Sequence, residues 1–464
     1  MIRFGTSGWR AVISDEFTFD NVRRVTRAVA RYLAESPGTE GQGVAVGYDT
    51  RFLSENFAAE AAAVLAAEGR PAWLSPVALP TPVLAFAILE GGLAGGINIT
   101  ASHNPPEYNG MKFSTSDGAP APLEVTDRIE KLSGEVSSAA VSVGAEEISV
   151  LQPGEAYFAR LGKLVGEDVL GSARLRIAVD SRFGTTRGWL DVFLERCGVE
   201  VIRLHDRRDP LFGGTSPDCS GTNLDDLRSA VVDQQLDLGL ATDGDGDRFG
   251  IVDADGEIVN ANLVLALLVD YLHTSRGWDE GVGRTVATTH LVDRVAAEHG
   301  FAVHETPVGF KYFQPLLASG RVFLAGEEIA GLSVKGHVPE KDGILAACLV
   351  AEMVAATGSA VGTLVEDLFR RVGTVLSRRE DRRFAPEQRA ALAERLERRP
   401  SRLAGVHVAE VNTIDGVKWV REDGSWVLVR VSGTEPVVRV YAEAGDAAAL
   451  DALIASGLDM IPCA

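Results

Sequence analysis

The sequence lacks a long uninterrupted apolar run. Its 464 residues are 46% hydrophobic and 24% charged, the balance of an ordinary globular protein. No stretch reaches the roughly 20 consecutive apolar residues of a membrane span, and the opening residues MIRFGTSGWR lack the apolar centre of a signal peptide. We therefore expect a soluble, cytoplasmic protein with no membrane partner, and the length suggests three or four domains.

Cysteine is also scarce, and no two cysteines form a Cys-x-x-Cys pair. The chain has four, at Cys197, Cys219, Cys348 and Cys463. This spacing matches neither a thiolate zinc site nor a disulfide framework, and it is typical of proteins from a reducing compartment. We expect these thiols to be buried and inert.

Basic residues are outnumbered. Lysine and arginine together number 45 against 65 aspartates and glutamates, which gives a net charge of −20. Such an excess repels nucleic acid and anionic membrane, so we expect neither as a partner. If the substrate is an anion, its binding field must come from local arginines, lysines and backbone amides.

One pattern recurs three times: an apolar strand, a small polar turn, an amphipathic helix and a second apolar strand. The first strands are GVAVGYDTR (43–51), LRIAVDSRFG (175–184) and GRTVATTH (283–290). Each helix is followed by a glycine suited to a left-handed cap: Gly69, Gly198 and Gly300. The pattern predicts parallel sheets with crossover helices, which bind ligands at the carboxyl ends of their strands. It leaves function open, because βα repeats occur in many unrelated proteins.

The C-terminal part of the chain has a different pattern. Residues 406–433 alternate between apolar and polar side chains, with Asp-Gly turn signals at 415–416 and 423–424. A helix from about Ala447 to Gly457 follows. These features predict an α+β domain with a mostly antiparallel sheet.

Two stretches resemble seams between domains. Residues 132–150 are small and polar, and residues 371–402 are rich in arginine and glutamate. We therefore predict an α/β protein with three similar mixed α/β domains and a C-terminal α+β domain. The predicted boundaries are 1–150, 151–255, 256–370 and 371–464.

The loop TASHNPPEYNGMKF, residues 100–113, directly follows a short apolar strand. It places a hydroxyl, an imidazole and an ammonium close together at Ser102, His103 and Lys112. Ser102 lacks the Gly-x-Ser-x-Gly elbow of acyl-transfer serines, so His103 and Lys112 are the candidates for activating it. Taken alone, the loop is equally consistent with a polar turn whose serine caps a backbone amide.

The loop ATDGDGDRFG, residues 241–250, carries Asp243, Asp245 and Asp247 at i, i+2 and i+4. In extended geometry this spacing points all three carboxylates the same way. Carboxylates held together need a cation, and Mg²⁺ is the first choice. An EF-hand is excluded because Arg248 stands at position 6 and Ala254 at position 12. A solvated acidic turn is the alternative.

The stretch GEEIAGLSVKGHVPEKDG, residues 326–343, combines glycines with Glu327 and Glu328. Carboxylates on a mobile glycine-rich loop suit hydrogen bonds to several sugar hydroxyls. A charged surface loop is an alternative of equal standing.

The stretch RVSGTEPVVRVYAE, residues 430–443, predicts an anion site. Ser432, Gly433 and Thr434 can form a turn that offers successive N–H groups and two hydroxyls. Arg430 and Arg439 flank this turn and can each bind phosphate. The alternative is an ordinary turn between two strands.

These four loops, in this order, resemble those of the α-D-phosphohexomutase superfamily, the phosphoglucomutase/phosphomannomutase family. The matching motifs are FGTSGWR, TASHNPP, DGDGDR, GEE and RVSGTEP, and the resemblance covers essentially the whole chain. It implies a four-domain protein around a central cleft, to which each domain contributes one loop. It also implies that Ser102 is a phosphoserine. One Mg²⁺ ion is then held by the phosphate of Ser102 and by Asp243, Asp245 and Asp247.

The resemblance implies roles for the other matching residues. Phosphoryl transfer and acid–base chemistry are expected of Arg10, His103 and Lys112, with Arg248 beside the reacting groups. The run TPVGFK, residues 306–311, corresponds to a specificity loop whose Lys311 points to the substrate. The sugar hydroxyls and the non-reacting phosphate are expected to be held by Glu327, Arg430, Ser432, Gly433, Thr434 and Arg439.

The implied reaction interconverts hexose 1-phosphate and hexose 6-phosphate. Ser102 gives its phosphoryl group to the hexose, the resulting 1,6-bisphosphate turns end for end, and the other phosphate returns to the serine. Hexose phosphates are the expected partners, hexose 1,6-bisphosphate is the expected activator, and a monomer or homodimer is expected.

One position departs from the family pattern. Relatives commonly read GEESGG or GEMSGH in the sugar loop, whereas Ile329 and Ala330 follow GEE here. A hydroxyl expected to contact the sugar is therefore missing, and such contacts can discriminate between substrates by orders of magnitude. We expect a phosphoglucomutase. The alternatives are a phosphomannomutase or a dual-specificity enzyme, then a phosphoglucosamine mutase, a variant that releases the bisphosphate, and a non-catalytic sugar-phosphate-binding relative.

Overall fold

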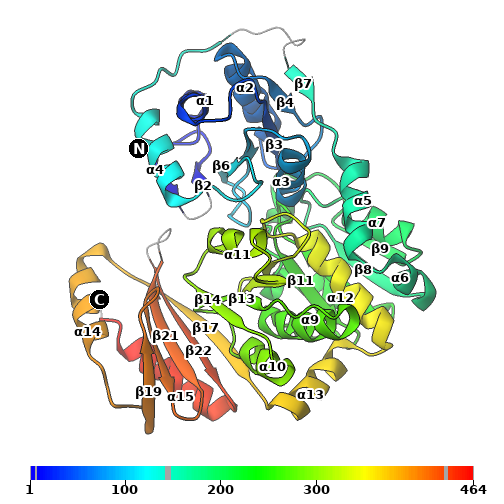
Figure 1. Ribbon diagram of the computed structural model, residues 1–464, viewed down its shortest axis with the longest axis vertical. Helices are drawn as coiled ribbons and strands as arrows, with labels where there is room; N and C mark the ends of the chain where they lie inside the picture. The colour runs from blue at the N-terminus through cyan, green and yellow to red at the C-terminus, as the bar shows by residue number, and fades with distance from the viewer. Residues whose placement is uncertain (1, 6–7, 142–147, 433–436, 463–464) are drawn as a thin grey trace.

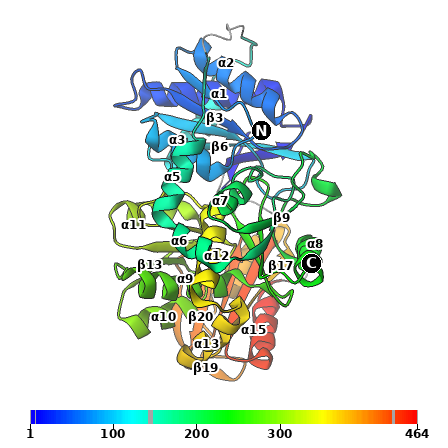
Figure 2. The same cartoon turned by 90° about the vertical axis from the view of Figure 1, so that its right-hand side faces the viewer.

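The chain forms four sheets that follow one another along the sequence. The computed structural model describes residues 2–5, 8–141, 148–432 and 437–462. The sheets have seven, five, four and six strands. Figure 1 shows the N-terminal part in blue at the top and the C-terminal part in orange and red at the lower left. In the turned view of Figure 2, the first sheet and its helices lie at one end of the molecule.

The first sheet has the strand order β1-β2-β6-β5-β3-β4-β7. Its strands are β1 (Phe4–Gly5), β2 (Gly8–Val12), β3 (Val44–Tyr48), β4 (Ala72–Leu74), β5 (Gly95–Ile99), β6 (Tyr108–Thr115) and β7 (Ile148–Val150). Its helices are α1 (Phe19–Glu35), α2 (Ser54–Ala67), α3 (Thr81–Glu90) and α4 (Leu123–Ser133). α1 begins after Thr18, whose side chain accepts the N–H of Asn21. Val22, Val25 and Val29 bury one face of this helix.

The second sheet has the order β12-β11-β10-β8-β9. Its strands are β8 (Arg176–Asp180), β9 (Glu200–Leu204), β10 (Leu238–Thr242), β11 (Phe249–Asp253) and β12 (Ile258–Val259). The helices of this part are α5 (Gly154–Leu164), α6 (Glu167–Ala173), α7 (Leu190–Arg196) and α8 (Asp225–Asp233), with 3-10 turns η2 (Phe212–Gly214) and η3 (Gly221–Leu224). Cys197, Cys219 and Cys348 are buried and free, as predicted, and Cys463 lies outside the described residues.

The third sheet has the order β14-β13-β15-β16. Its strands are β13 (Val282–Thr285), β14 (Val303–Thr306), β15 (Leu324–Glu327) and β16 (Gly331–Val334). Its helices are α9 (Ala261–Arg276), α10 (Leu291–His299), α11 (Gln314–Ala318), α12 (Gly343–Thr357) and α13 (Val361–Val372), with the 3-10 turn η4 (Phe310–Tyr312). In the described part of the chain no single helix is long and apolar enough to cross a bilayer, and α12 and α13, which pass that test only as a pair, are bent by 79°.

The first three sheets share a four-stranded core. Three parallel strands and one antiparallel strand stand in the same order in each: β4-β3-β5-β6, β9-β8-β10-β11 and β14-β13-β15-β16. The predicted repeat is confirmed, since each repeat begins with the central strand of its core. The predicted helix-ending glycines all have positive φ: Gly69, Gly198 and Gly300. The loop from the third parallel strand to the antiparallel one carries the serine motif, the aspartates and the end of the GEE motif. The three motifs therefore occupy one topological position.

The fourth sheet is antiparallel, in the order β17-β22-β21-β20-β19-β18. Its strands are β17 (Leu376–Arg383), β18 (Arg402–Leu403), β19 (Val406–Asn412), β20 (Val417–Arg421), β21 (Trp426–Val431) and β22 (Val437–Ala444). α14 (Arg389–Glu397), the 3-10 turn η5 (Pro386–Gln388) and α15 (Ala447–Asp459) complete this part. The two predicted Asp-Gly turns join β19 to β20 and β20 to β21.

The predicted seam at residues 371–402 contains the junction between the third and fourth domains, but most of it is structured and belongs to the fourth domain. This stretch contains β17, which pairs with β22 along its whole length. β17 reads LSRREDRR because it is an exposed edge strand, so its charged side chains hide the strand pattern. The other predicted seam, 132–150, ends in β7, which pairs with β4.

The first and fourth domains have apolar cores of their own, while one large core joins the second and third domains and also includes α3 of the first. α12 passes through the shared core and contacts β10, β11 and β16. It begins at Asp342, whose side chain accepts the N–H of Leu345. The fourth domain meets the third in a small apolar cluster formed by Val286, Ala287, Trp426, Leu428 and Tyr441. Polar contacts, such as the N–H of His290 donating to the carboxylate of Glu443, join the same two domains.

Candidate active site

Ser102 lies in the loop between β5 and β6. Its φ of 51° is in the left-handed region, and its N–H donates to Thr100 Oγ1 at 2.9 Å. The side chain is buried, and Oγ donates to Asp243 Oδ2 at 2.8 Å. His103 Nδ1 lies 3.3 Å from the same Oγ. The hydroxyl therefore faces Asp243, the first aspartate of the acidic motif in the second domain, rather than capping a backbone amide.

Arg51 holds the serine loop from behind and is not among the residues predicted from the sequence. Its buried guanidinium forms an ion pair with Asp49, with 3.0 Å between Nε and Oδ2. The ring centre of Phe212 from the second domain lies 5.1 Å from the guanidinium carbon. The two Nη atoms donate to four carbonyls of the serine loop, those of Ser102, Asn104, Pro105 and Tyr108. The Asp-x-Arg pattern after the first parallel strand was the available signal.

Replacing Arg51 by lysine is expected to lower the free energy of unfolding by about 3 kcal/mol, because one ammonium cannot reach four carbonyls and Asp49 together. The turnover number should fall with it, since the backbone around Ser102 loses its support. Chemical denaturation and a mutase assay measure the two effects. Arg70→Lys is the matched control: Arg70 is another buried arginine of the first domain, and it donates to the carbonyl of Thr39. Its replacement should affect stability while sparing turnover; equal losses of turnover would contradict a specific role for Arg51.

The three aspartates lie in the loop between β10 and β11. Asp243 Oδ1 accepts the N–H groups of Asp247 (3.0 Å) and Arg248 (3.1 Å), and Gly246 has a φ of 73°. The loop is thus a closed turn, and the expected extended geometry is wrong, because hydrogen bonds to Asp243 curl the backbone. The carboxylates still gather: one oxygen from each of the three lies within 4.8 Å of the others.

The aspartate cluster has the donor set of a cation site. Among the described residues, Asp245 Oδ1 and Asp247 Oδ1 are buried and accept no hydrogen bond. Asp245 Oδ2, in contrast, accepts from Thr81 Oγ1 and Lys112 Nζ, each at 2.6 Å. Burial, and next the two neighbouring carboxylates, raises the pKa of Asp243 well above its usual value. A hard divalent cation would relieve this repulsion and could be bound by Asp245 Oδ1 and Asp247 Oδ1, so the residues fit Mg²⁺.

Two lysines neutralise part of this cluster. Lys112 Nζ lies 2.6 Å from Asp245 Oδ2 and 2.9 Å from Asp247 Oδ2. Burial alone would lower the pKa of Lys112, but the two carboxylates outweigh it and raise that pKa, so the ammonium stays charged. Lys341 of the third domain lies 3.4 Å from Asp247 Oδ2. Lys341, in the turn Pro-Glu-Lys-Asp at 339–342, is not among the residues predicted from the sequence.

Arg10 and Arg248 act on His103. Arg10 on β2 donates to Asn104 Oδ1 at 2.7 Å, and Arg248 Nε lies 4.0 Å from Asp247 Oδ1. Burial, and after it the charges of Arg248 and Arg10, lowers the pKa of His103 well below its usual value. The imidazole is therefore neutral near pH 7, the state in which it can accept a proton.

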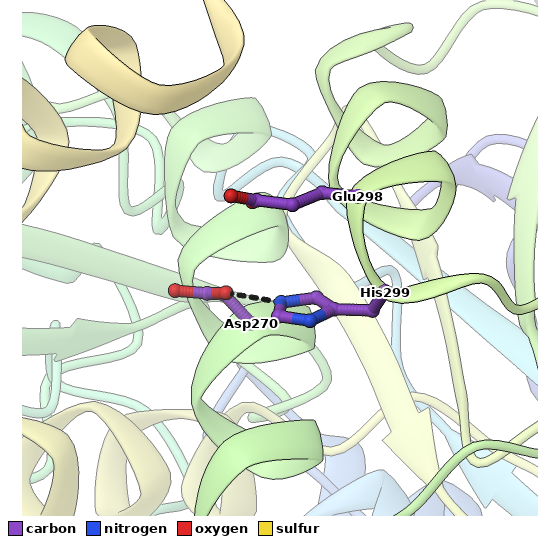
Figure 3. A group of neighbouring side chains, drawn as sticks. All are labelled: Asp270, Glu298 and His299. Carbon is purple, nitrogen blue, oxygen red and sulfur yellow. Dashed lines mark hydrogen bonds and ion pairs between the residues drawn. The ribbon is translucent and has the colours of Figure 1, made fainter.

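A second acidic group with a histidine is shown in Figure 3: Asp270 of α9 with Glu298 and His299 of α10. His299 Nε2 lies 2.7 Å from Asp270 Oδ1. Arg371 of α13 pairs with both carboxylates, at 2.5 Å from Asp270 Oδ2 and 2.9 Å from Glu298 Oε2. Because Arg371 already supplies the positive charge, this group links three helices and has no need of a metal ion.

Glu327 ends β15 and lies opposite Gly331 of β16. The two strands form a tight hairpin in which Ala330 has a φ of 63°, so the carboxylate is not presented on the mobile loop that the glycines suggest. Glu327 Oε1 accepts the N–H of Gly309 at 3.0 Å. Burial raises the pKa of Glu327 to about 7, against the opposing charge of Lys341.

The predicted specificity loop, residues 306–311, contacts this hairpin through Gly309. The ammonium of Lys311 lies 5.5 Å from the ring centre of Tyr312. Within the described residues, no hydrogen bond or ion pair joins Lys311 to another predicted site residue. Glu328 Oε2, beside Glu327, accepts from Thr285 Oγ1 at 3.1 Å. The structure therefore places the glutamates more firmly than the lysine.

Arg430 of β21 and Arg439 of β22 stand opposite each other in the fourth sheet. Each arginine has an acidic partner. Arg430 Nε lies 2.8 Å from Asp415 Oδ2, and Arg439 Nε lies 3.7 Å from Asp381 Oδ2. Two arginines at adjacent positions of neighbouring strands can bind one phosphate together.

Of the predicted phosphate turn, the structure describes Ser432, whose N–H donates to the carbonyl of Val437 at 2.9 Å. Gly433 and Thr434 lie outside the described residues, so their contacts stay predictions. The predicted residues thus fall into a group around the serine, a group in the fourth domain, and Lys311 and Glu327 of the third domain. The first group comprises Arg10, Ser102, His103, Lys112, Asp243, Asp245, Asp247 and Arg248.

Four family models match consecutive parts of the chain. Their descriptions are phosphoglucomutase/phosphomannomutase, alpha/beta/alpha domains I, II and III, and the C-terminal domain of the same family. They match residues 1–139, 155–256, 260–372 and 378–457. The order of the matches is the order of the four sheets.

Individual relatives are similar over almost the whole chain. A phosphoglucomutase of Komagataeibacter xylinus is 32% identical, with 97% of this chain and 88% of the relative covered. A phosphoglucosamine mutase of Frankia alni is 33% identical, with 97% and 95% covered. The crystal structure of a putative phosphomannomutase from Thermus thermophilus has a TM-score of 0.87 at 34% identity, with 99% of both chains covered. The three relatives bear the names of three different sugars, so similarity leaves the hexose undetermined.

Proposed function

Because this chain belongs to the phosphoglucomutase/phosphomannomutase family of phosphohexomutases, we propose that it interconverts hexose 1-phosphate and hexose 6-phosphate through a phosphoryl group carried on Ser102. One observation carries this proposal: Ser102 Oγ lies 2.8 Å from Asp243 Oδ2, an oxygen of the candidate metal cluster. A phosphoryl group on Ser102 Oγ would lie beside a bound cation and beside the ammonium of Lys112.

In the first half-reaction, phospho-Ser102 gives its phosphoryl group to the free hydroxyl of a hexose monophosphate. The bond from phosphorus to Ser102 Oγ breaks while a bond from phosphorus to the hydroxyl oxygen forms. The hydroxyl proton passes to neutral His103, whose Nδ1 is 3.3 Å from the leaving serine oxygen and can return the proton to it. Lys112 keeps its proton and stabilises charge on the transferring oxygens. The products are hexose 1,6-bisphosphate and free Ser102.

The second half-reaction is the reverse of the first with the bisphosphate turned end for end. Ser102 takes the other phosphate, and the second hexose monophosphate leaves. Free bisphosphate would act as activator, because one of its phosphates can rephosphorylate Ser102. Both monophosphates carry a phosphate away from the reacting hydroxyl, so one fixed phosphate site serves both orientations. Its proposed residues are Arg430, Ser432, Gly433, Thr434 and Arg439.

Asp243, Asp245 and Asp247 would hold one Mg²⁺ ion, with an oxygen of the phosphoserine as a further ligand. When bound, the ion adds positive charge beside the transferring phosphoryl group. The chain prepares this site: Thr81 and Lys112 fix Asp245, and the N–H groups of residues 247 and 248 fix Asp243.

We propose glucose as the preferred hexose, with mannose or both sugars as the alternative. Glu327 and Glu328 present carboxylates that can accept from sugar hydroxyls. Among the described residues, Glu328 Oε1 is buried and has no hydrogen-bond partner, so it is available to such a hydroxyl. Ile329 supplies no hydroxyl of its own.

A coupled assay on the 1-phosphates of glucose, mannose and glucosamine tests the proposal. We expect the highest kcat/KM with glucose 1-phosphate. A higher value with one of the other sugars would reassign the preferred hexose and leave the mutase chemistry standing. Absence of turnover with all three, in the presence of Mg²⁺ and glucose 1,6-bisphosphate, would overturn the proposed function.

Activity is expected to fall as the pH drops through about 7, because Glu327 has a pKa of about 7 and accepts sugar hydroxyls best when ionised. Glu327→Gln should lower kcat/KM and flatten this part of the profile. The dependence of kcat/KM on pH, measured for both proteins from about pH 5.5 to about pH 9, tests the effect. An unchanged acid limb in Glu327→Gln would assign the limb to another group.

Glu327 has the opposite effect on stability: its contribution to the unfolding free energy falls as the pH rises, whereas activity increases. Burial raises the pKa of Glu327 from its ordinary 4.5 to about 7. The folded state therefore binds the proton more tightly than the unfolded state, and the resulting stabilisation is complete below about pH 4.5 and lost as the pH rises through about 7. The difference in unfolding free energy between the protein and Glu327→Gln should follow that course.

A further inference from the structure

The hairpin formed by β19 and β20 fastens the fourth domain to the third. Three of its residues make polar contacts across the boundary. Asn412 donates to Glu305, and Lys418 Nζ donates to the carbonyl of Val286 at 2.9 Å. Between them, Asp415 accepts the N–H of Val308 at 3.1 Å. Figure 1 shows this sheet alongside β13 and β14 of the third domain.

Asp415 differs from Asn412 and Lys418 because it also contacts Arg430 on β21, a residue of the proposed phosphate site. The oxygen that accepts from Val308, Oδ2, is the same oxygen that accepts from Arg430 Nε at 2.8 Å. The turn is pressed against that strand: a Cβ at Gly416 would lie 2.6 Å from the carbonyl oxygen of Val429 and 3.0 Å from Arg430 Cβ. Gly416, with a φ of 84°, therefore keeps Asp415 next to Arg430.

The contact continues from Val308 to the sugar hairpin. The next residue, Gly309, donates its N–H to Glu327 Oε1 at 3.0 Å. Glu327 is 2% exposed, so this N–H is a main determinant of where its carboxylate lies. A continuous path thus runs from the guanidinium of Arg430 through Asp415 and the peptide units of 308 and 309 to Glu327.

We propose that Asp415 is a positioning residue that couples phosphate binding at Arg430 to the placement of the sugar-binding carboxylate of Glu327. The proposal rests on the proposed function. Arg430 uses Nε for Asp415, which orients the guanidinium and leaves its two Nη groups for a phosphate. The same carboxylate oxygen anchors the specificity loop. A phosphate bound to Arg430 therefore affects, through Asp415, the loop that binds Glu327. Binding of the distal phosphate in this way fixes the position of the sugar-binding carboxylate.

Amide hydrogen exchange on the unliganded protein tests the physical link without requiring catalysis. In Asp415→Ala, peptides covering residues 306–312 should exchange about tenfold faster, because the N–H of Val308 loses a charged acceptor. Asp423→Ala is the matched control: Asp423 occupies the other Asp-Gly turn of the sheet and binds Arg421 and Ser425, within its own domain. It should leave that exchange unchanged.

Ligand binding tests the coupling. Glucose 1-phosphate is titrated into proteins that also carry Ser102→Ala, so that no turnover occurs. Asp415→Ala should weaken binding about tenfold. Asp381→Ala removes an acidic neighbour of Arg439 and should weaken binding while leaving the exchange of 306–312 unchanged, because Asp381 lies on β17 and its described ion pairs stay within the fourth sheet.

Each result decides the proposal. Unchanged exchange of 306–312 in Asp415→Ala, equal acceleration in Asp423→Ala, or faster exchange with unaltered affinity for glucose 1-phosphate would each overturn it. Loss of the proposed function would show up differently, as absence of mutase activity in the unmodified protein with a normal exchange pattern.

Discussion

Replacement of Ser102 by alanine is expected to lower kcat at least about a thousandfold, the loss seen when a covalent nucleophile is removed. The substitution removes the only atom that carries the phosphoryl group in the proposed reaction. It leaves the surrounding backbone intact, because Arg51 binds carbonyl oxygens and the Ser102 N–H binds Thr100. The fold should therefore survive, with a modest loss of about 1–3 kcal/mol for the unsatisfied Asp243.

The matched control is Ser114→Ala, a change of a mostly buried serine on β6 that follows the same loop. It should keep both turnover and covalent phosphate. A coupled mutase assay and intact-mass measurement compare the two variants. Undiminished turnover in Ser102→Ala would remove the serine from the mechanism.

Replacement of Asp243 by asparagine is expected to abolish the response to Mg²⁺ and to lower kcat by about three orders of magnitude, since a catalytic cation contributes several kcal/mol of charge stabilisation. The physical reason lies in the cluster: burial, and next the two neighbouring carboxylates, raises the pKa of Asp243, and two carboxylate oxygens lack partners among the described residues. In the unmodified protein, Mg²⁺ at about a hundred times its dissociation constant should add roughly 2.7 kcal/mol to the unfolding free energy.

Asp270→Asn provides the control for a general effect of acidic groups. Asp270 belongs to the second acidic cluster, in which Arg371 already pairs with the carboxylates. Its replacement should therefore leave the Mg²⁺ response intact. Thermal unfolding with and without Mg²⁺, together with a metal titration of activity, distinguishes the two clusters. A Mg²⁺-dependent rise in melting temperature that persists in Asp243→Asn would contradict the assigned metal site.

Local sequence patterns were sufficient to predict the fold of the first three domains. The strands around 43–51, 175–184 and 283–290 are short, apolar and bounded by turns, so their period and their following helices are readable without tertiary information. β17 was missed for the opposite reason. Its exposed side chains are charged, and only its pairing with the distant β22 makes it a strand.

The candidate site was predicted where chemistry and spacing coincide in one loop. The serine and aspartate motifs are recognisable because few structural reasons place those side chains together. Arg51, Thr81 and Lys341 were missed because each reaches the site from another element, through a contact that no local pattern encodes. The geometry of the aspartate turn was missed too, since hydrogen bonds from backbone N–H groups decide it.

The sugar remains the least specified part of the site. Ile329 stands where relatives commonly have serine, and the structure places it at the tip of a tight hairpin next to Glu327 and Glu328. In the proposed function, discrimination between sugars then depends on the two carboxylates and on the predicted specificity loop, whose Gly309 binds the first of them. This is why the contact between Gly309 and Glu327 is important for both the pH profile and the coupling through Asp415.

Transfer of label from Ser102 tests the central claim most directly. The protein is phosphorylated with glucose 1,6-bisphosphate labelled in both phosphates, freed of ligand, and mixed with unlabelled glucose 1-phosphate in the presence of Mg²⁺. The account predicts that label leaves Ser102 and appears in glucose phosphates, while the amount of phosphate on the serine stays constant. Label that remains on the protein, resides on another residue, or is released as inorganic phosphate instead would contradict it.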